Sequence, residues 1–545
     1  MQAPLWRWLR AGVLIAVFLV ATAGAALAVG EVRGGGGDTP TLRVGAQPLE
    51  PDEATGEELL QRDNEFIGQR TAGDIQLDPQ AAGQLRAAAV KAAKALKPAP
   101  SPGPITFNAA WRGLGPNPIV QVSTSTSSFT AMSGRIGALS IRPSNGQFIL
   151  GGAQGGIWLY DARNGVWTPK TDTLPSLAIG ALAIAPSDDK IVYAGTGEGA
   201  LSGDSYFGNG ILKSTNGGNT WSHVSGDYFE GVSTTRLVVD PGNPNHLFVA
   251  IARGRGGTHR VTPPEHSRYG IWESKDGGVT WTLLKEATGE INPACATIQS
   301  CGVGATDLEL DPQNPQILYA SFWGDAIYKS TDGGATWSSI TNFGFPSPNF
   351  GASQTRFSIS LSHPKNKAAV LYAGFSWRDA SGNHAARVFK STDEGASWTM
   401  LPTGAGGPQG VNDSVEGYCG GQCFYDNVVE ADPTNPDVVF VGGQFGYSLS
   451  PPSGGIFRSD DGGQTWLNLG WNQHPDFHAL AFDPKHLNHV LIGSDGGVWF
   501  SPDDGGRTKT SDPLSSVDWQ NLNGTVDPNT AGVTHRTGLA ITQFT

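Results

Sequence analysis

The chain has little positive charge and few charged residues of any kind. It carries 36 lysines and arginines against 49 acids, a formal net charge of −13, and only 16% of its 545 residues are charged. Proteins that bind nucleic-acid backbones need clustered lysine and arginine to displace counterions. The sequence therefore predicts no nucleic-acid partner.

Long hydrophobic runs are also scarce, and the clearest one lies at the N-terminus. The segment "AGVLIAVFLV" follows Arg7 and Arg10, and the small-residue motif "ALA" at 26–28 comes after it, which is the pattern of a cleaved export signal. We interpret residues 1–28 as a signal peptide, although about 20 apolar residues can also serve as an uncleaved membrane anchor. Either interpretation predicts a secreted, periplasmic or cell-surface protein, with no membrane span once the signal is removed.

Cysteine is scarce as well. Cys295 and Cys301 flank five residues, and Cys419 and Cys423 flank three. Each pair can close a small loop in an oxidising compartment, whereas neither has the two-residue spacing typical of zinc ligands. We therefore predict two local disulfides rather than a four-thiolate site, and the sequence predicts no metal and no cofactor.

Glycine, proline and tryptophan are abundant, with 75, 36 and 16 residues, which is typical of many short strands joined by tight turns. Residues 29–104 differ from the rest of the chain. They contain a glycine run, the alanine-rich stretch "AAGQLRAAAVKAAKAL" with high helix propensity, and the proline-rich linker "KPAPSPGP". We interpret this region as a low-complexity and partly helical arm.

From Trp111 onward the chain consists of repeats. The octet "STDGGATW" at 330–337 closes with a tryptophan, and such octets recur at intervals of roughly 55 to 70 residues. The other four copies are "STNGGNTW" at 214–221, "SKDGGVTW" at 274–281, "STDEGASW" at 391–398 and "SDDGGQTW" at 459–466. A strand–turn–strand pattern such as "LVVDPGNPNHLFVA" precedes most of them. With weaker copies at both ends, units of four strands are predicted to begin near residues 135, 178, 233, 304, 356, 425 and 476.

These repeats predict an all-β protein, a β-propeller of four-stranded blades over residues 105–545. Seven blades fit the spacing best, and six to eight are compatible with it. The segment "WRGLGP" at 111–116 resembles a last strand with no blade before it, and "GLAITQFT" at 538–545 resembles a first strand with no blade after it. Either these ends pair to close the ring or the chain is the front part of a longer array, and we favour the second interpretation.

The octet has a folding role in each of its positions. An aspartate can accept hydrogen bonds from its own turn, glycine tolerates positive φ, and a tryptophan can pack between neighbouring sheets. A calcium loop would place acids at alternate positions, which the octet does not do, and five equivalent acids around a ring cannot meet at one substrate. We predict that the octets fasten the third strand to the fourth.

The pattern Ser-x-Asp-x-Gly-x-Thr-Trp resembles the Asp-box, or BNR repeat, of the β-propellers in sialidases, xyloglucan-hydrolysing glycosidases and sortilin-type receptors. The resemblance runs from about residue 111 to the C-terminus and is specific for the fold. It implies either a carbohydrate-active protein, glycoside hydrolase-like or glycan-binding, or a non-catalytic propeller that binds an extracellular protein or peptide. Whether the chain is an enzyme and how it oligomerises stay open.

Antiparallel strands place all octets on one face, so the variable loops and any site are expected on the other. The residues predicted to begin the inner strands there include Arg135, Arg356, Tyr425 and Asp476. Resemblance to sialidases implies arginines that bind a carboxylate, a tyrosine nucleophile and an aspartate acid/base, and "GRIG" at 134–137 is similar to the Arg-Ile-Pro stretch of that family. A third arginine has no candidate.

Other acids complete the set of candidates. Glu198 and Asp204 lie in a long loop on the same face and are predicted to contribute to ligand binding. Xyloglucanase-like chemistry needs two carboxyl groups, and the family's Asp-Ile-Gly-Gly turn corresponds here to 153–156, where Gln154 replaces the acid. Asp495 lies in a similar turn of the last unit, although Asp-Gly is also a common hairpin turn. Asp476 and Asp495 are therefore the catalytic candidates.

Four further charged residues are predicted inside inner strands. They are Arg236, Asp307, Glu309 and Glu430. Because a charge buried between blades needs a partner, we expect these residues to form ion pairs with one another rather than to catalyse a reaction.

Overall fold

The computed structural model describes the repeated part of the chain and two residues before it. The described residues are 132–163, 165–200, 205–256, 259–260, 268–287, 304–343, 355–378, 384–404, 415–419, 422–446, 453–469, 476–503 and 519–523, with Ala88 and Lys91. All of them belong to the compact unit Ala54–Thr545. Ala88 and Lys91 are helical and lie in the predicted arm, whereas the predicted signal peptide lies outside the described residues. No helix in the described part of the chain is long and apolar enough to cross a membrane.

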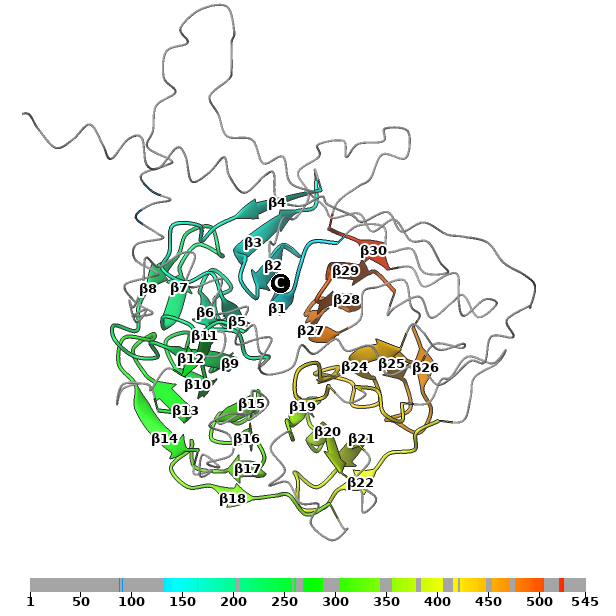
Figure 1. Cartoon of the computed structure of the whole chain (residues 1–545). Helices are drawn as coiled ribbons and strands as arrows, with labels where there is room; N and C mark the ends of the chain where they lie inside the picture. The colour runs from blue at the N-terminus through cyan, green and yellow to red at the C-terminus, as the bar shows by residue number, and fades with distance from the viewer. Residues whose placement is uncertain are drawn as a thin grey trace, which may run out of the picture. The chain divides into compact units, whose positions relative to one another are not determined.

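Seven four-stranded antiparallel sheets are formed by the described residues, each from one stretch of the sequence (Figure 1). The inner strands are β1 (Ile136–Ile141), β5 (Ile179–Ile184), β9 (Val232–Val239), β15 (Ala305–Leu310), β19 (Ser358–Ser362), β23 (Val428–Ala431) and β27 (Phe477–Asp483). The second strands are β2 (Phe148–Gly152), β6 (Val192–Thr196), β10 (Leu247–Arg253), β16 (Leu318–Phe322), β20 (Val370–Arg378), β24 (Val439–Gly446) and β28 (His486–Ser494).

The outer half of each sheet is shorter. The third strands are β3 (Gly156–Asp161), β7 (Ile211–Ser214), β13 (Gly270–Ser274), β17 (Ile327–Ser330), β21 (His384–Ser391), β25 (Ser453–Ser459) and β29 (Gly497–Ser501). The outermost strands are β4 (Val166–Pro169), β8 (Ser222–His223), β14 (Thr282–Glu286), β18 (Ser338–Ser339), β22 (Thr399–Met400), β26 (Leu467–Asn468) and β30 (Gln520–Asn521). A two-stranded ribbon of β11 (Arg255–Gly256) and β12 (His259–Arg260) lies between β10 and β13.

Contacts between neighbouring inner strands arrange the sheets as the blades of a ring. They run β1–β5–β9–β15–β19–β23–β27 and return from β27 to β1, as the circular arrangement in Figure 1 shows. The prediction of an all-β, seven-bladed propeller is confirmed. The predicted unit starts are also close to the observed ones, since the largest difference is three residues, Tyr425 against Val428.

The seam between the last and first blades closes by packing of side chains. Ile136, Phe148 and Trp167 of the first blade share a hydrophobic cluster with Leu491 and Val498 of the last. The described residues thus bring the first and last blades into contact, whereas the segments 111–116 and 538–545 lie outside the described residues. That this chain is the front part of a longer array stays a prediction.

The octets fasten the third strand to the fourth, as predicted. In the octet that follows β17, the Asp332 carboxylate accepts hydrogen bonds from the backbone N–H of Thr336 (2.9 Å), from its hydroxyl (2.6 Å) and from the Ser330 hydroxyl (2.8 Å). The Trp337 indole N–H donates to the carbonyl of Gly334 at 2.9 Å. The Thr336 hydroxyl, followed by the other donors, lowers the pKa of Asp332 to about 2. The carboxylate of Asp332 is thus occupied by hydrogen bonds within its own turn.

The octet tryptophans pack against the preceding blade. Trp281 of the third blade is 6% exposed and shares a cluster with Tyr193 and Ile211 of the second blade. Its ring also meets Phe229 edge to face, with 5.0 Å between the ring centres. Blade-to-blade packing therefore depends on a residue that the repeat supplies once per unit.

Inner strands share one irregularity near the start of the strand. In five blades the ladder to the second strand skips a single residue, which forms a β-bulge at the same register position. The bulged residues are Gly137, Gly180, Thr235, Thr306 and His478. A bulge turns its residue out of the regular alternation of faces, so this position can be used differently from blade to blade.

We expect Trp281→Ala to lower the free energy of unfolding by about 3–5 kcal/mol, because it removes a large buried side chain and leaves a cavity between two blades. Urea denaturation followed by circular dichroism measures the change. Trp281→Phe is the control, since it retains an aromatic ring and should lose less. A loss below about 1 kcal/mol for the alanine variant would contradict the packing role.

Candidate functional site

Side chains from three blades meet at the end of the channel that the variable loops surround. Asp495 follows β28, and its carboxylate accepts hydrogen bonds from Arg135 Nε (2.9 Å) and from the Tyr425 hydroxyl (2.8 and 2.6 Å). His478, in β27, lies 2.6 Å from the same carboxylate through Nε2. Arg135 directly precedes β1, and Tyr425 lies shortly before β23. The first, sixth and seventh blades therefore share one carboxylate.

Glu198, from the loop after β6, adds a fourth blade. It is fully buried, and its carboxylate pairs with the Arg135 guanidinium. That guanidinium also lies 4.8 Å from the centre of the Tyr425 ring. The Tyr425 and His478 rings are in edge-to-face contact, 4.6 Å apart. We call Arg135, Glu198, Tyr425, His478 and Asp495 the mouth cluster.

The charges in the mouth cluster follow from these contacts. Burial alone would raise the pKa of Asp495, but Arg135 and then His478 hold it well below its usual range. Burial lowers the pKa of His478 in spite of the adjacent carboxylate. Its Nδ1 atom has no hydrogen-bond partner among the described residues. His478 is therefore neutral at pH 7 and donates its Nε2 proton to the ionised Asp495.

A second pair of carboxyl groups lies beside the mouth cluster. Asp426 is completely buried, and neither of its carboxylate oxygens accepts a hydrogen bond from a described N–H or O–H group. Burial is the main cause that raises the pKa of Asp426 well above its usual range, and the adjacent Asp476 carboxyl is the second. Two carboxyl groups that lie side by side disfavour the ionisation of both. Asp426, with a raised pKa, and Asp495, with a lowered one, are therefore shifted in opposite directions.

Asp476 itself has an unusual backbone. Its φ is 66°, in the left-handed region that residues other than glycine seldom adopt. Its carbonyl accepts a hydrogen bond from the Asp495 N–H at 3.3 Å. Asp476 is partly exposed whereas Asp426 is not. A strained and partly exposed acid beside a buried acid is typical of a functional position.

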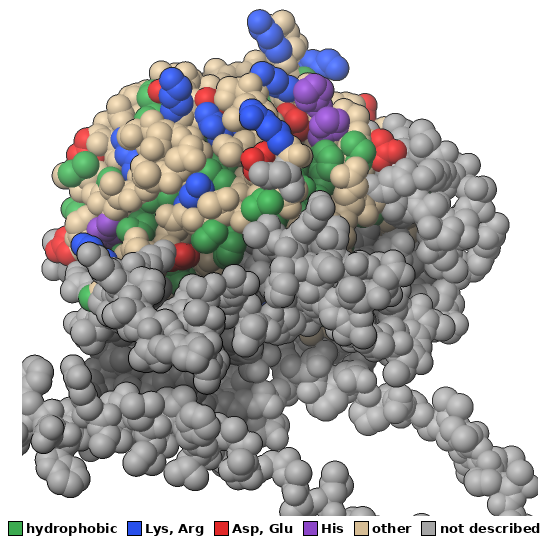
Figure 2. Space-filling model, turned by 90° about the horizontal axis from the view of Figure 1, so that it is seen from above, with side chains coloured by type: hydrophobic (Ala, Val, Ile, Leu, Met, Phe, Trp, Pro, Cys, Tyr) green, Lys and Arg blue, Asp and Glu red, His purple; other side chains and the backbone are tan. Residues whose placement is uncertain are grey.

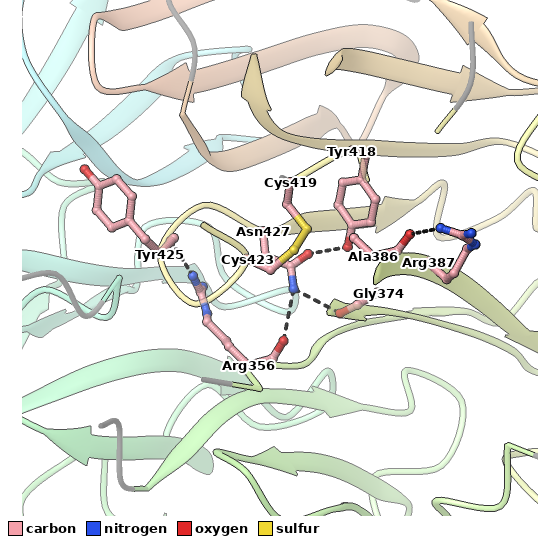
Figure 3. Close-up of a disulfide and its surroundings, with 9 residues drawn as sticks. All are labelled: Arg356, Gly374, Ala386, Arg387, Tyr418, Cys419, Cys423, Tyr425 and Asn427. Carbon is pink, nitrogen blue, oxygen red and sulfur yellow. Dashed lines mark hydrogen bonds between the residues drawn. A yellow bond between two sulfur atoms is a disulfide. The ribbon is translucent and has the colours of Figure 1, made fainter. Parts of the chain in front are cut away.

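The disulfide Cys419–Cys423 is formed, and it closes the loop that carries Tyr425 (Figure 3). The second predicted pair, Cys295 and Cys301, lies outside the described residues. Near the bridge, the Tyr418 hydroxyl donates to the side-chain oxygen of Asn427 at 2.6 Å. Figure 3 shows the Tyr425 side chain directed away from the bridge.

Arg356 supports this loop from the fifth blade. Its guanidinium donates to the backbone carbonyl of Tyr425 at 2.6 Å, and its own carbonyl accepts from the Asn427 amide at 3.2 Å. Burial lowers its pKa. Among the described contacts, Arg356 thus donates to the backbone carbonyl of Tyr425, whereas Arg135 pairs with the carboxylates of Glu198 and Asp495.

Most of the residues predicted from the sequence therefore lie together. Arg135, Tyr425, Glu198 and Asp495 form direct contacts, and Asp476 lies beside them. Asp204 lies outside the described residues, and Arg356 lies behind the site. The prediction missed three residues that follow predicted strand starts by one or two positions. They are Asp426, Asn427 and His478.

The predicted ion pairs inside the ring are confirmed. Arg236 of β9 lies 2.8 Å from Glu309, 3.4 Å from Glu430 and 3.5 Å from Asp307. A cavity of about 100 Å³ runs between these groups and the mouth cluster, lined by both arginines, Arg135 and Arg236. Burial raises the pKa of Glu309 despite Arg236. One arginine therefore faces three acids.

The comparisons with known proteins agree with this architecture. No protein-family model matches the chain. It is 26% identical over 321 residues to the xyloglucanase Xgh74A of Acetivibrio thermocellus, covering 47% of this chain and 35% of that protein. It is 26% identical over 345 residues to a Paenibacillus xyloglucanase, covering 58% of this chain and 29% of the relative. The chain thus spans about a third of the length of the relatives it matches.

Solved structures also align with part of the chain. The chain aligns with the GH74 xyloglucanase from Xanthomonas campestris at 18% identity and a TM-score of 0.46, over 68% of this chain and 53% of that one. It aligns with an ancestral GH74 enzyme at 17% identity and a TM-score of 0.48, over 75% and 49%. The chain is a β-propeller of the Asp-box type. Among known proteins it is distantly related to the GH74 xyloglucanases.

We expect Asp426→Asn to be more stable than the wild type at pH 7–8. An acid whose pKa is raised by folding contributes its full stability below the unfolded value of about 4, and that contribution is lost as the pH rises toward the folded pKa. Asparagine has the same shape and nothing to titrate, so the variant should show a weaker decline between pH 5 and 8. Urea denaturation midpoints between pH 5 and 8 measure this decline in stability. The exposed Asp437→Asn is the control. Equal declines in the wild type and both variants would contradict the raised pKa of Asp426.

Proposed function

We propose that this chain is a carbohydrate-active propeller that binds a glycan over the mouth cluster. The observation that carries the proposal is the convergence of unrepeated titratable residues from four blades on the face opposite the octets. Variable loops on a rigid ring are where binding residues usually lie. The distant relationship to proteins named xyloglucanases supports a glycan ligand.

The arrangement also provides the groups for hydrolysis. A glycoside hydrolase needs one carboxyl group that carries a proton and a second that is ionised. Asp476 is partly exposed and lies beside Asp426, whose pKa is raised by burial and by Asp476, so we assign Asp476 as the proton donor. Asp495 is ionised and held by three donors. It is therefore a weak base, and we assign it to stabilising positive charge that develops on the sugar.

This assignment differs from the site that the family resemblance implied. Gln154 stands in the turn where xyloglucanase-like glycosidases carry an acid, so that acid cannot take part here. The neighbouring acids Asp426 and Asp476 lie in the sixth and seventh blades instead. We therefore propose a glycan-active site built mainly from the last two blades, with Arg135 from the first blade and Glu198 from the second.

A protein- or peptide-binding propeller is the alternative. It would require a contiguous apolar patch, whereas the large hydrophobic residues that are exposed among the described ones are Val279, Met400 and Leu467. Each lies in or beside a different blade's outermost strand. Figure 2 shows a largely polar surface with hydrophobic side chains in small groups. The described surface therefore favours a glycan ligand. We also propose that the protein is exported, on the strength of residues 1–28 alone.

The test is a hydrolysis and binding screen on xyloglucan and other plant and bacterial glycans. Asp476→Asn should lower kcat by about 10²- to 10⁴-fold with little change in glycan binding, because general-acid catalysis contributes a factor of this size. Asp495→Asn should weaken both binding and hydrolysis, because it releases Arg135, Tyr425 and His478.

Asp437→Asn is the control, since Asp437 is an exposed aspartate in a turn on the octet face. It should behave as the wild type. Binding without hydrolysis would retain the glycan site and remove the role of Asp476 as proton donor. Equal binding and activity in all four proteins, or no glycan bound by the wild type, would contradict the proposed site.

A further inference from the structure

Three metal-binding side chains lie together at the turn between β27 and β28 on the octet face. Asp483 Oδ2 is 3.3 Å from Nδ1 of His486 and 3.6 Å from Nδ1 of His489. The two imidazole rings are stacked, with 4.9 Å between their centres. One donor atom from each residue lies within 4.8 Å of the other two. Figure 2 shows histidine side chains adjoining on the surface, near acidic and basic ones.

The equivalent turn of the third blade shows what the repeat alone requires. There, Asp240 accepts a hydrogen bond from the N–H of Gly242 at 2.8 Å, and its other oxygen lies 2.8 Å from His246 Nδ1. Glu273, in β13, occupies the second nitrogen of His246 at 2.8 Å. In this blade the imidazole is held between two carboxylates, and it has no nitrogen left for another ligand.

The last blade keeps the first half of that arrangement and changes the second. The N–H of Lys485 donates to Asp483 Oδ1 at 2.9 Å, so the carboxylate is fixed by its turn in the same way. His489 follows Asp483 by six residues, as His246 follows Asp240. Phe500, however, stands in the place of Glu273, since each precedes the serine that ends its third strand. The His489 ring packs edge to face on Phe500, 5.6 Å between centres.

His486 is the second change. The corresponding residue of the third blade is Asn243. The substitution of a histidine for asparagine, together with the loss of the second carboxylate, converts an Asp–His–Glu staple into two imidazoles and one carboxylate. Two histidines and an acid form a common ligand set for zinc and related ions.

The spacing also suits such an ion. Zinc binds imidazole nitrogen and carboxylate oxygen at about 2.0–2.2 Å, so two ligand atoms of a tetrahedral site lie about 3.3–3.5 Å apart. The separations of 3.3 and 3.6 Å between Asp483 Oδ2 and the two nitrogens are close to that edge, and the three donor atoms lie within 4.8 Å of one another. The Asp483 side chain is 8% exposed, whereas that of His486 is 59% exposed. The ligand set is therefore anchored on one side and open to water on the other.

We propose that Asp483, His486 and His489 bind one divalent transition-metal ion of the zinc class, with water completing the coordination. The ion would brace the β27–β28 turn at the seam between the last and first blades. Lys485 Nζ in this turn lies 3.5 Å from the carbonyl of Ser144 in the first blade. The ring of Phe500, on which His489 packs, contacts the ring of Phe148 across the same seam, with 5.2 Å between the ring centres. This site is independent of the glycan site, which lies on the opposite face.

The test uses the untagged full chain, treated with a chelator and titrated with Zn²⁺ by calorimetry. The wild type should bind Zn²⁺, and Tm should rise when the ion is added. His486→Asn restores the residue of the third blade and, because His486 is exposed, should fold normally. This variant and His489→Gln should each weaken Zn²⁺ binding at least tenfold and abolish the rise in Tm. The visible absorption of bound Co²⁺ should show the intensity of a tetrahedral site.

His246→Gln is the matched control, because it removes a histidine from the equivalent turn and should leave Zn²⁺ binding unchanged. Equal Zn²⁺ affinity in the wild type and His486→Asn would overturn the proposal, since the ion would then be held elsewhere in the chain. Absence of Zn²⁺ binding by the wild type would overturn it as well. Loss of binding in His486→Asn with retention in His246→Gln would support it.

Discussion

The close approach of neighbouring inner strands is the constraint on which the propeller depends. At the bulge, each inner strand lies against a backbone carbonyl at the start of the next blade. A Cβ atom on Gly137 would lie only 2.2 Å from the Ile179 carbonyl oxygen, and Gly180 is confined as tightly by its own neighbours. Where the residue is Thr235, its hydroxyl donates to the Ala305 carbonyl at 2.8 Å. The position therefore accepts glycine, which leaves the carbonyl room, or threonine, which bonds to it.

The same position distinguishes the last blade from the others. His478 stands at the bulge that glycine or threonine occupies in other blades, and its imidazole bonds to Asp495. The Asp495 carboxylate in turn accepts hydrogen bonds from Arg135 and Tyr425. His478 lies inside an inner strand, one of the most constrained parts of the fold, so the ring itself fixes the imidazole that contacts Asp495. The mouth cluster thus arises where the repeat departs from its own rule.

The sequence predicts the repeated features well and the unrepeated ones in part. Octets and strand–turn–strand patterns predict the blades closely, because each repeated residue, such as Asp332 or Trp281, has the same local role in every copy. Counting along the repeat also placed Arg135 and Tyr425 at the strand starts. It could not place His478, because a bulge adds one residue without any marker in the sequence. The positive φ of Asp476 and the burial of neighbouring acids depend on contacts between distant blades, which composition and spacing do not reveal.

The carboxyl groups of the fold divide into two classes with opposite effects on stability. The Thr336 hydroxyl lowers the pKa of Asp332, and the ion pair of the mouth cluster lowers that of Asp495 against the effect of burial. Such groups stabilise the fold above about pH 4 and lose this effect as the pH falls through their lowered pKa. Burial raises the pKa of Asp426 and Glu309, so their contribution declines as the pH rises above about 4. In mildly acidic solution both classes are satisfied. Enzymes separate acid and base roles by shifting the pKa values of neighbouring carboxyl groups in opposite directions, and the opposite shifts of Asp426 and Asp495 result from burial on one side and from ion pairing on the other.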